Sequence, residues 1–171
     1  VESILIPAGV TSIGWRAFQD CTSLINIYYN GDIEGWCNIE GVVYLMSYGV
    51  SEKLFYIGKE VVTEIVIPNS VMSIGSHAFK GCKSLTSVVI PDSVTSIGSY
   101  AFAYCTSLKS IEIPNSVTSI GKQAFYNRTS LTRIEYKGTV NECETNGLNS
   151  SDIWSGVPIG FIGCSDGKVL I

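Results

Sequence analysis

The chain has few of the residues that usually build an active site. Among its 171 residues there are one histidine and two methionines, and only 15% of the residues are charged. It has no Cys-x-x-Cys, no His-Glu-x-x-His and no glycine-rich phosphate loop, and its Asp and Glu residues lack the spacing of a calcium loop. The single histidine, His77, occupies a repeat position held elsewhere by Arg16, Tyr100 and Gln123, which is typical of an exposed, variable position. We therefore predict no catalytic residue, no cofactor, no metal and no enzymatic activity.

The chain also lacks an excess of basic residues and a long apolar run. The net charge of -4 and the pI near 4.9 argue against nucleic acid, which would need a basic stripe, and disfavour attachment to anionic lipid, so we expect no nucleic-acid partner. No apolar run reaches the roughly 18 residues needed to cross a bilayer, so we expect no direct membrane insertion of this stretch. No signal-peptide pattern is visible, and the sequence opens in the middle of a repeat. We therefore expect it to be a fragment of a longer chain.

What is present is a repeat. The pairs Ile67-Pro68, Ile90-Pro91 and Ile113-Pro114 lie 23 residues apart. Each pair is followed at matching offsets by the same series, which in the first copy is Val71, Ile74-Gly75, Ala78-Phe79 and Leu85. An earlier copy begins at Ile6-Pro7. A period of this length predicts a solenoid, in which each unit buries its apolar face by stacking on the next unit.

The residues of one repeat predict the shape of a coil. In the segment 108–113, Ile111 and Ile113 alternate with Ser110 and Glu112, as in a half-buried strand. Pro114 ends this strand, because it has no N–H to donate. A second extended piece runs from 117 to 120, and the segment 122–127 suits one or two helical turns on the outer side. We predict a single α/β solenoid domain: a right-handed superhelix with a parallel concave sheet, short outer strands or helical turns, and a C-terminal capping hairpin.

The period breaks twice, and the two breaks resemble each other. The segment 27–33 contains Tyr29 and Gly31 at the spacing of Tyr136 and Gly138 in the segment 134–140, so we interpret both as one variant coil used twice. Gly58-Lys59 and Asp166-Gly167 each join two apolar runs and predict hairpins, of which the second covers the open end of the sheet. We assign regular coils to 3–26 and 65–133, irregular coils to 27–64 and 134–158, and the C-terminal cap to 159–171.

The cysteines and tryptophans admit two interpretations each. Cys21, Cys82 and Cys105 share one repeat position, so they form either a ladder of buried thiols or part of a disulfide framework. Stacked side chains point the same way, which is poor geometry for a disulfide and favours the ladder. Trp36 and Trp154 lie in the irregular coils and are either plugs for those coils or ligand platforms, and we favour plugs. The cysteines do not decide the redox compartment.

The repeat resembles a known family. Leu-x-x-Ile-x-Ile-Pro-x-x-Val-x-x-Ile-Gly-x-x-Ala-Phe-x-x-Cys is carried in full by residues 85–105, and by residues 108–128 with Arg128 in place of the Cys. This pattern is similar to the BspA-like (Treponema pallidum-type) class of leucine-rich repeat. The resemblance implies a secreted or surface-displayed protein of bacteria or parasitic protists that adheres to host proteins or other cells. At Arg128, where the chain departs from the pattern, we expect the thiol ladder to end.

The predicted concave face is the candidate binding surface. Its outward residues, in register, are Asn26, Tyr28, Glu64, Val66, Ser87, Val89, Ser110, Glu112, Arg133 and Glu135. This row changes from aromatic and aliphatic to charged, which is typical of a protein-binding face, although β-branched residues also stabilise strands wherever they lie.

Three functions are compatible with this surface and the chain around it. We expect a monomeric, non-catalytic module, extracellular or at the cell surface, that binds a host matrix or cell-surface protein. The alternative is a structural spacer that holds another domain away from the cell. An enzyme with its site in segment 31–56 or 142–158 is a third, disfavoured hypothesis.

Overall fold

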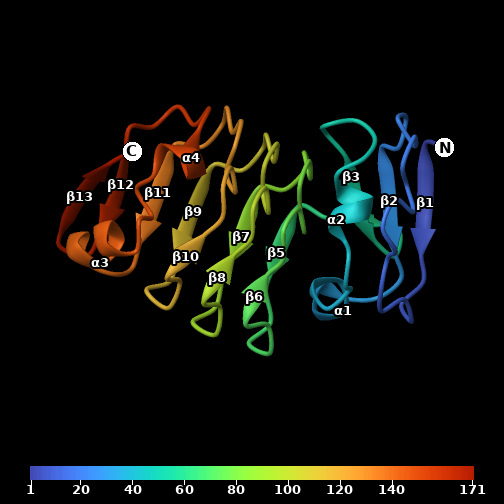
Figure 1. The fold of residues 1–171 in the computed structure, drawn as a ribbon, viewed down its shortest axis with the longest axis horizontal. Coiled ribbons are helices and arrows are strands. Elements are labelled where there is room, and N and C mark those ends of the chain that lie inside the picture. The colour runs from blue at the N-terminus through green and yellow to red at the C-terminus, as the bar shows by residue number, and fades with distance from the viewer.

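The computed structural model describes residues 1–171 as an elongated stack of coils, with the two chain termini at opposite ends (Figure 1). Each coil contributes one strand to a mainly parallel face. These strands are β1 (Ser3–Ile6), β2 (Asn26–Tyr29), β3 (Leu54–Ile57), β5 (Glu64–Val66), β7 (Ser87–Val89), β9 (Ser110–Ile113), β11 (Arg133–Tyr136) and β12 (Phe161–Cys164). The regular coils add a second layer of two-residue strands: β6 (Ser73–Ile74), β8 (Ser96–Ile97) and β10 (Ser119–Ile120).

The strand register follows the repeat period. Ile65 pairs with Val88, and Ile111 pairs with Ile134, so equivalent residues lie side by side in neighbouring coils. The second layer is continuous from β6 through β8 to β10. The concave sheet is not: β5 pairs with β7 and β9 pairs with β11, but β7 and β9 are not paired, and neither are β4 (Glu60–Val61) and β5. The face is therefore three short sheets in succession, held together by the layers behind them.

An aromatic column runs through the core beneath these sheets. The Phe rings of the regular coils stack in order, with centroids 5.5 Å apart between Phe79 and Phe102 and 5.8 Å apart between Phe102 and Phe125. The column ends on Trp154 at 4.7 Å from Phe125 and continues the other way to Phe55 at 6.4 Å from Phe79. Their close alignment confirms the prediction that identical segments stack, each coil covering the apolar layer of the one before.

The Ile-Gly pair makes a corner where two coils approach closely. A Cβ on Gly98 would lie 2.4 Å from the Ser76 backbone nitrogen, and a Cβ on Gly121 would lie 2.4 Å from that of Ser99. Real Cβ atoms do not tolerate such distances, so any other residue would push the coils apart. At Gly98 and Gly121 the glycine is therefore needed for contact between coils, whereas a Cβ on Gly14 or Gly75 would meet no atom within 4 Å.

The outer segment of each regular coil is a run of hydrogen-bonded turns, where we had expected one or two helical turns. In the segment 122–127, Gln123 (φ 55°) and Asn127 (φ 54°) both have left-handed backbone conformations, which interrupt a right-handed helix. Their N–H groups donate to the next coil instead, to the carbonyls of Asp152 and Ser155. The outer turns are thus joined along the stack by their own ladder of backbone hydrogen bonds.

The helices lie in the irregular coils. They are α1 (Ile33–Cys37), α2 (Val43–Met46), α3 (Val140–Thr145) and α4 (Ser151–Trp154). α1 is capped by Asp32, whose side chain accepts from the Gly35 N–H, and α3 is capped by Thr139, which forms a capping box with Glu142. The equivalence of these two helix starts agrees with the interpretation of one variant coil used twice.

Both predicted hairpins are present. β3 pairs antiparallel with β4, and β12 pairs antiparallel with β13 (Gly167–Leu170). Trp36 and Trp154 are buried, and their indole N–H groups donate to the backbone carbonyls of Ala78 (2.9 Å) and Leu148 (2.6 Å). Both tryptophans are therefore plugs of the irregular coils, as favoured from the sequence.

The cysteine position is a buried column that ends in cations. Cys82 and Cys105 are buried, and all six cysteines are free thiols. Cys21, the third member of the predicted ladder, is half-buried and is separated from Cys82 by the coil that carries Lys53. Arg128 occupies the next position of the column, is fully buried, and donates from Nη2 to the Phe102 carbonyl at 2.6 Å. Lys53 is paired with Cys82 at the other end, and its ammonium donates to the Val50 carbonyl. The thiol ladder thus ends at Arg128 as predicted, in a buried cation that keeps the repeat position.

Candidate binding face

The structure places every predicted face residue on a strand of the concave sheet. Of the face residues, Glu64 and Val66 lie on β5, Ser87 and Val89 on β7, Ser110 and Glu112 on β9, and Arg133 and Glu135 on β11; all are exposed except Glu135, which is half-buried. Asn26 and Tyr28 lie on β2 and are half-buried. Because alternate residues of these strands are buried in the core, the named side chains point to the opposite side, away from it.

The N-terminal half of the face is an aromatic and aliphatic row. Leu5, Tyr28 and Tyr56 are register partners across β1, β2 and β3. The rings of Tyr28 and Tyr56 stack with centroids 4.3 Å apart and planes inclined by 17°. Leu5 beside them is 56% exposed. Burial, and then the neighbouring Tyr28 hydroxyl, raise the pKa of Tyr56, so this phenol stays a neutral donor at physiological pH.

Two valines continue this row into the next sheet. Val66 and Val89 are register partners and are 65% and 55% exposed. We call Leu5, Tyr28, Tyr56, Val66 and Val89 the apolar row. Apolar side chains that gather on one face of a protein, rather than being scattered singly, mark interaction sites.

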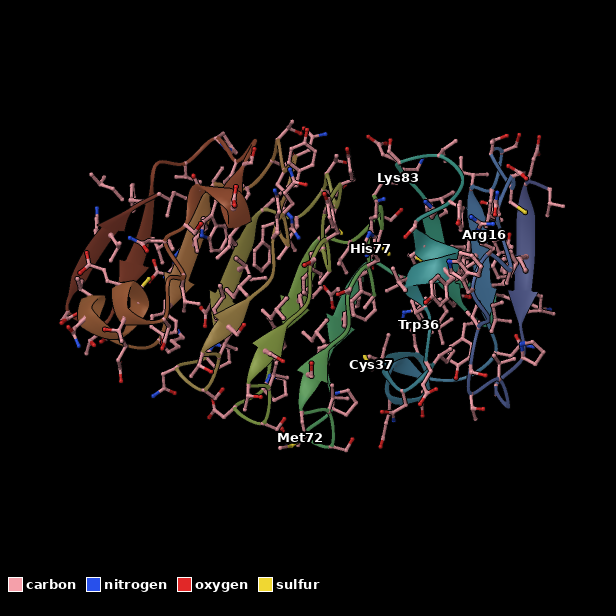
Figure 2. The ribbon with its side chains drawn as sticks, in the orientation of Figure 1. Arg16, Trp36, Cys37, Met72, His77 and Lys83 are labelled. Atoms are coloured by element: carbon pink, nitrogen blue, oxygen red, sulfur yellow. The ribbon has the colours of Figure 1, made fainter.

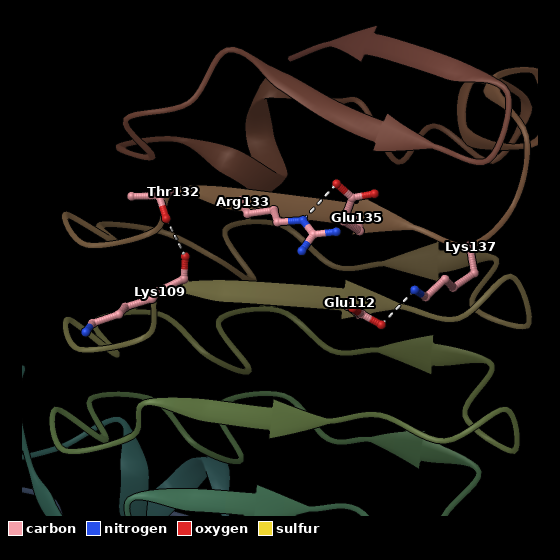
Figure 3. A network of polar contacts seen from close by, with 6 residues as sticks. All are labelled: Lys109, Glu112, Thr132, Arg133, Glu135 and Lys137. Atoms are coloured by element: carbon pink, nitrogen blue, oxygen red, sulfur yellow. Dashed lines mark hydrogen bonds and ion pairs between the residues drawn. The ribbon is translucent and has the colours of Figure 1, made fainter.

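The C-terminal half of the face carries charges that pair with each other (Figure 3). Lys137 Nζ lies 2.7 Å from Glu112 Oε2, and Arg133 Nε donates to Glu135 Oε1 at 3.0 Å. The hydrogen bond from Lys137 lowers the pKa of Glu112, against a smaller opposing effect of burial. These side chains remain in contact with solvent, so each ion pair contributes little to stability, and a charged group of a partner can replace either member of a pair.

Two hollows mark the place where the halves meet. One of about 240 Å³ lies at the unpaired junction of β7 and β9 and is lined by Ser87, Val88, Val89, Ile90, Ser110 and Glu112. A smaller one of about 100 Å³ lies beside it and is lined by Ile90, Asp92, Glu112, Pro114 and Lys137. The face is therefore indented where the apolar row gives way to the charged residues.

His77, Cys37 and Cys105 are candidates for catalysis by residue type, but they lie outside the concave strands, and their shifted pKa values make them poorly suited to catalysis. His77 lies on the outer turns (Figure 2), where it is half-buried and not exposed as its repeat position predicted. Its ring stacks on Tyr100, with centroids 4.9 Å apart. Desolvation, and then Lys80 and Lys53, lower the pKa of His77 to about 4, so it is neutral at physiological pH. Burial raises the pKa of Cys37 to about 12 and that of Cys105 to about 11, which keeps both thiols protonated and poorly nucleophilic.

Neither a metal cluster nor a spanning helix is found. The structure brings together no group of three or more His, Cys, Asp or Glu side chains that could hold a metal ion. Its helices are all too short to traverse a bilayer.

Leu5 and Tyr56 are members of the row that sequence reasoning missed. Leu5 precedes Ile6-Pro7 just as Val66 and Val89 precede their Ile-Pro pairs, so the repeat itself carried the signal. Tyr56 lies in a segment that was correctly predicted as a strand, but its pairing with Tyr28 depends on the length of the excursion between them. The sequence gives the length of that excursion, but not which residues of β2 and β3 it brings opposite each other.

The comparison with families of known sequence gives one match. Residues 1–38 and 49–156 match the model described as "BspA type Leucine rich repeat region", in six copies. The comparison with curated proteins gives no match.

Several solved structures are similar to the chain. A leucine-rich repeat protein from Eubacterium ventriosum is 25% identical, with a TM-score of 0.50, over 80% of this chain and 36% of that one. A leucine-rich cell surface protein from Faecalibacterium prausnitzii is 29% identical, with a TM-score of 0.48, over 80% and 39%. The T. pallidum leucine-rich repeat protein is 23% identical, with a TM-score of 0.45, over 80% and 58%. The chain thus spans less than two thirds of each of these structures.

Proposed function

The chain belongs to the BspA-type leucine-rich repeat family, and we propose that it is a non-catalytic module that binds a host or cell-surface protein through its concave face. Leucine-rich repeats of this type are protein-interaction or surface repeats, and the proposed location is the cell exterior, which is typical of the family. The observation that carries the proposal is the apolar row: the exposed Leu5, Val66 and Val89 and the half-buried Tyr28 and Tyr56, on five strands of one face.

The geometry of the row suits an extended partner. Neighbouring strands of a sheet lie about 4.8 Å apart, so a partner segment that crosses β1 to β3, or β5 to β7, meets a new side chain at each step. Between these two sheets the segment would have to bridge the unpaired junction. Two stacked tyrosines provide rigid area at low entropic cost, and aromatic residues are enriched where binding energy concentrates. The indentation between β7 and β9 gives such a partner a place to seat one bulky side chain.

The test is a triple variant of the apolar row. Tyr28→Lys, Val66→Lys and Val89→Lys place three cations where the partner would contact apolar surface, and they are expected to abolish adhesion of the purified protein to host matrix or cells. All three positions lie on the solvent side of their strands, so circular dichroism and thermal unfolding should show a folded protein.

A matched control adds the same charge elsewhere. Trp15, Val50 and Met72 are also exposed apolar residues, at 68%, 38% and 62%, and none lies on the concave strands. Their replacement by Lys should leave adhesion unchanged. Unchanged adhesion of a folded concave-face variant, or equal loss in both variants, would remove the concave face from consideration.

A spacer function is favoured by a separate observation. The charged half of the face is neutralised by its own pairs, and an uninterrupted aromatic column runs from Phe55 to Trp154 and stiffens that part of the stack. A chain that serves only as a spacer would show no specific binding in a pull-down from host matrix, whereas a longer stretch of the same protein would. Specific capture by residues 1–171 alone contradicts the spacer.

A further inference from the structure

A second candidate surface lies on the outer turns of three successive coils, residues 75–82, 98–105 and 121–128. Tyr100, Tyr104 and Tyr126 gather there, and we call them the tyrosine patch. The rings of Tyr104 and Tyr126 meet nearly edge to face, with centroids 5.3 Å apart and planes inclined by 76°. His77 stacks on Tyr100, and Lys80 Nζ lies 5.7 Å from the Tyr100 ring centre. Burial, and then the neighbouring Tyr126 and Tyr100 hydroxyls, raise the pKa of Tyr104, which agrees with the three phenols being close together.

The backbone at Tyr104 is unusual for a tyrosine. Its φ of 60° is left-handed, a region in which a bulky residue is rare. The same position is filled by Asp20, Gly81 and Asn127 in the other regular coils, which are the residue types that tolerate this conformation. The turn itself therefore does not call for tyrosine.

The turn is held without the phenol ring. The Tyr104 N–H donates to the Tyr126 carbonyl at 2.9 Å, and the Tyr100 N–H donates to the Lys122 carbonyl at 3.1 Å. The equivalent N–H of Gly81, which has no side chain, donates to the Ala103 carbonyl at 2.7 Å. Since the ladder forms equally with glycine and with tyrosine, the fold does not depend on the side chain at this position.

The charge around the patch is opposite to that of the whole chain. The three outer segments contain the cations Lys80, Lys122 and Arg128 and no Asp or Glu, while the net charge of the protein is -4. Lys122 is exposed and Lys80 half-buried, and neither is paired with a carboxylate. Arg128 is buried and does not contribute contacts at the surface. The three outer segments are thus basic and aromatic on an acidic protein, with Asp152 in the coil that stacks on the last of them.

We propose that the tyrosine patch, with Lys80 and Lys122, is a second binding surface that takes an acidic peptide segment of a protein partner. The two unpaired ammonium groups complement carboxylates, and the phenol hydroxyls are hydrogen-bond donors to them. A sugar ring would need an open aromatic face, whereas His77 stacks on one face of Tyr100 and the Tyr104 and Tyr126 rings meet edge to face, which reduces the open aromatic area. The chemistry that remains exposed, ring edges and donors, fits a peptide.

The experiment is an unbiased selection with one double variant for counter-selection. A displayed library of random 15-residue peptides is selected against the full chain and counter-selected against Tyr104→Asn/Lys80→Ser. Asn occupies the Tyr104 position in the next coil, so the variant should unfold at the same temperature as the wild type or higher. Enriched peptides should be rich in Asp and Glu, bind the wild type at least about tenfold more tightly than the variant, and weaken as salt rises.

Two controls make the outcome specific to this surface. Asn127→Gly alters the equivalent turn of the next coil without removing a ring, and it should bind the selected peptides as the wild type does. The concave-face triple lysine variant should bind them too, so failure of this proposal is separate from failure of the concave face. Soluble polygalacturonate serves as the anionic carbohydrate probe.

The proposal is overturned by any of three results. The first is a selection that yields no enriched peptides, or only peptides without an excess of Asp and Glu. The second is a double variant that binds the peptides as well as the wild type does, or that is less stable than the wild type. Lower stability would assign Tyr104 a structural role. The third is Tyr104-dependent binding of polygalacturonate without binding of any acidic peptide, which would assign the surface to carbohydrate.

Discussion

The two halves of the concave face have the same backbone and different side chains. At the position before each Ile-Pro pair, the outward residue is Leu5, Val66 and Val89 in three coils and Glu112 in the fourth. The residue before it points inward in every coil and is apolar throughout: Ile4, Ile65, Val88 and Ile111. The core therefore constrains one side of each strand and leaves the other free to vary. What differs between the halves is not required by the fold.

The two halves also differ in the free energy that a partner would gain by covering them. In the apolar row, burial by a partner would remove apolar area from water, which is favourable at roughly 25 cal/mol per Å². In the charged half, a partner would first have to replace the pairs Lys137–Glu112 and Arg133–Glu135, which gains little in solvent. We therefore place the binding energy in the N-terminal half and assign the charged half to orientation and solubility.

The largest expected effect tests whether the halves share one core. Phe79 lies in the coil of β5 and Phe125 in the coil of β9, and both are fully buried in the same column. Phe79→Ala and Phe125→Ala should each lower the free energy of unfolding by about 3–5 kcal/mol. Urea denaturation measures both. A loss below about 1 kcal/mol in one of them would show that the column does not unify the two halves.

A second comparison concerns binding. Tyr28→Ala/Tyr56→Ala removes the stacked pair, and it should weaken partner binding by about tenfold or more because two aromatic rings are lost from the contact. Glu112→Gln/Lys137→Met removes the charged pair and should change binding by less than about threefold. Surface plasmon resonance with the captured partner compares the two. A larger loss in the charged half would reverse the assignment.

The smallest effect is the stability contributed by the charged pair. A double-mutant cycle on Glu112→Gln and Lys137→Met should give a coupling of about 0.2–1 kcal/mol at neutral pH that shrinks in high salt. The pair lowers the pKa of Glu112 below its ordinary value of 4.5, so the contribution is present above that value and is lost as the pH falls through the lower, folded-state pKa. Chemical denaturation across this pH range measures it. A coupling that grows on acidification would contradict the geometry.

The sequence predicted the regular coils well because each residue type there has one physical role. The 23-residue spacing placed Phe79, Phe102 and Phe125 in one column, and Ile-Gly marked the close corners. The hairpins were signalled by Gly58-Lys59 and Asp166-Gly167, since two apolar runs flank each turn. These features depend on local patterns that the chain repeats.

The rest depended on contacts between coils that no local pattern reports. The left-handed backbone at Gln123 and Tyr100 is imposed by hydrogen bonds to the next coil, so the outer segments are turns and not helical. The unpaired junction of β7 and β9 joins two coils of identical pattern and could not be anticipated. The pairing of Tyr56 with Tyr28 likewise follows from how the irregular coil closes. Tyr28, Val66 and Val89 of the apolar row were therefore found from the sequence, while Leu5 and Tyr56 were not.

Site-specific photo-crosslinking on host cells or matrix tests the central claim most directly. p-Benzoylphenylalanine in place of Val89 sits in the apolar row beside the hollow, and in place of Met72 it sits on an equally exposed apolar position off the concave face. We predict a discrete crosslinked protein from position 89 and none from position 72. A crosslink from position 72 alone, or from neither position while the protein adheres, would contradict a concave-face binding module.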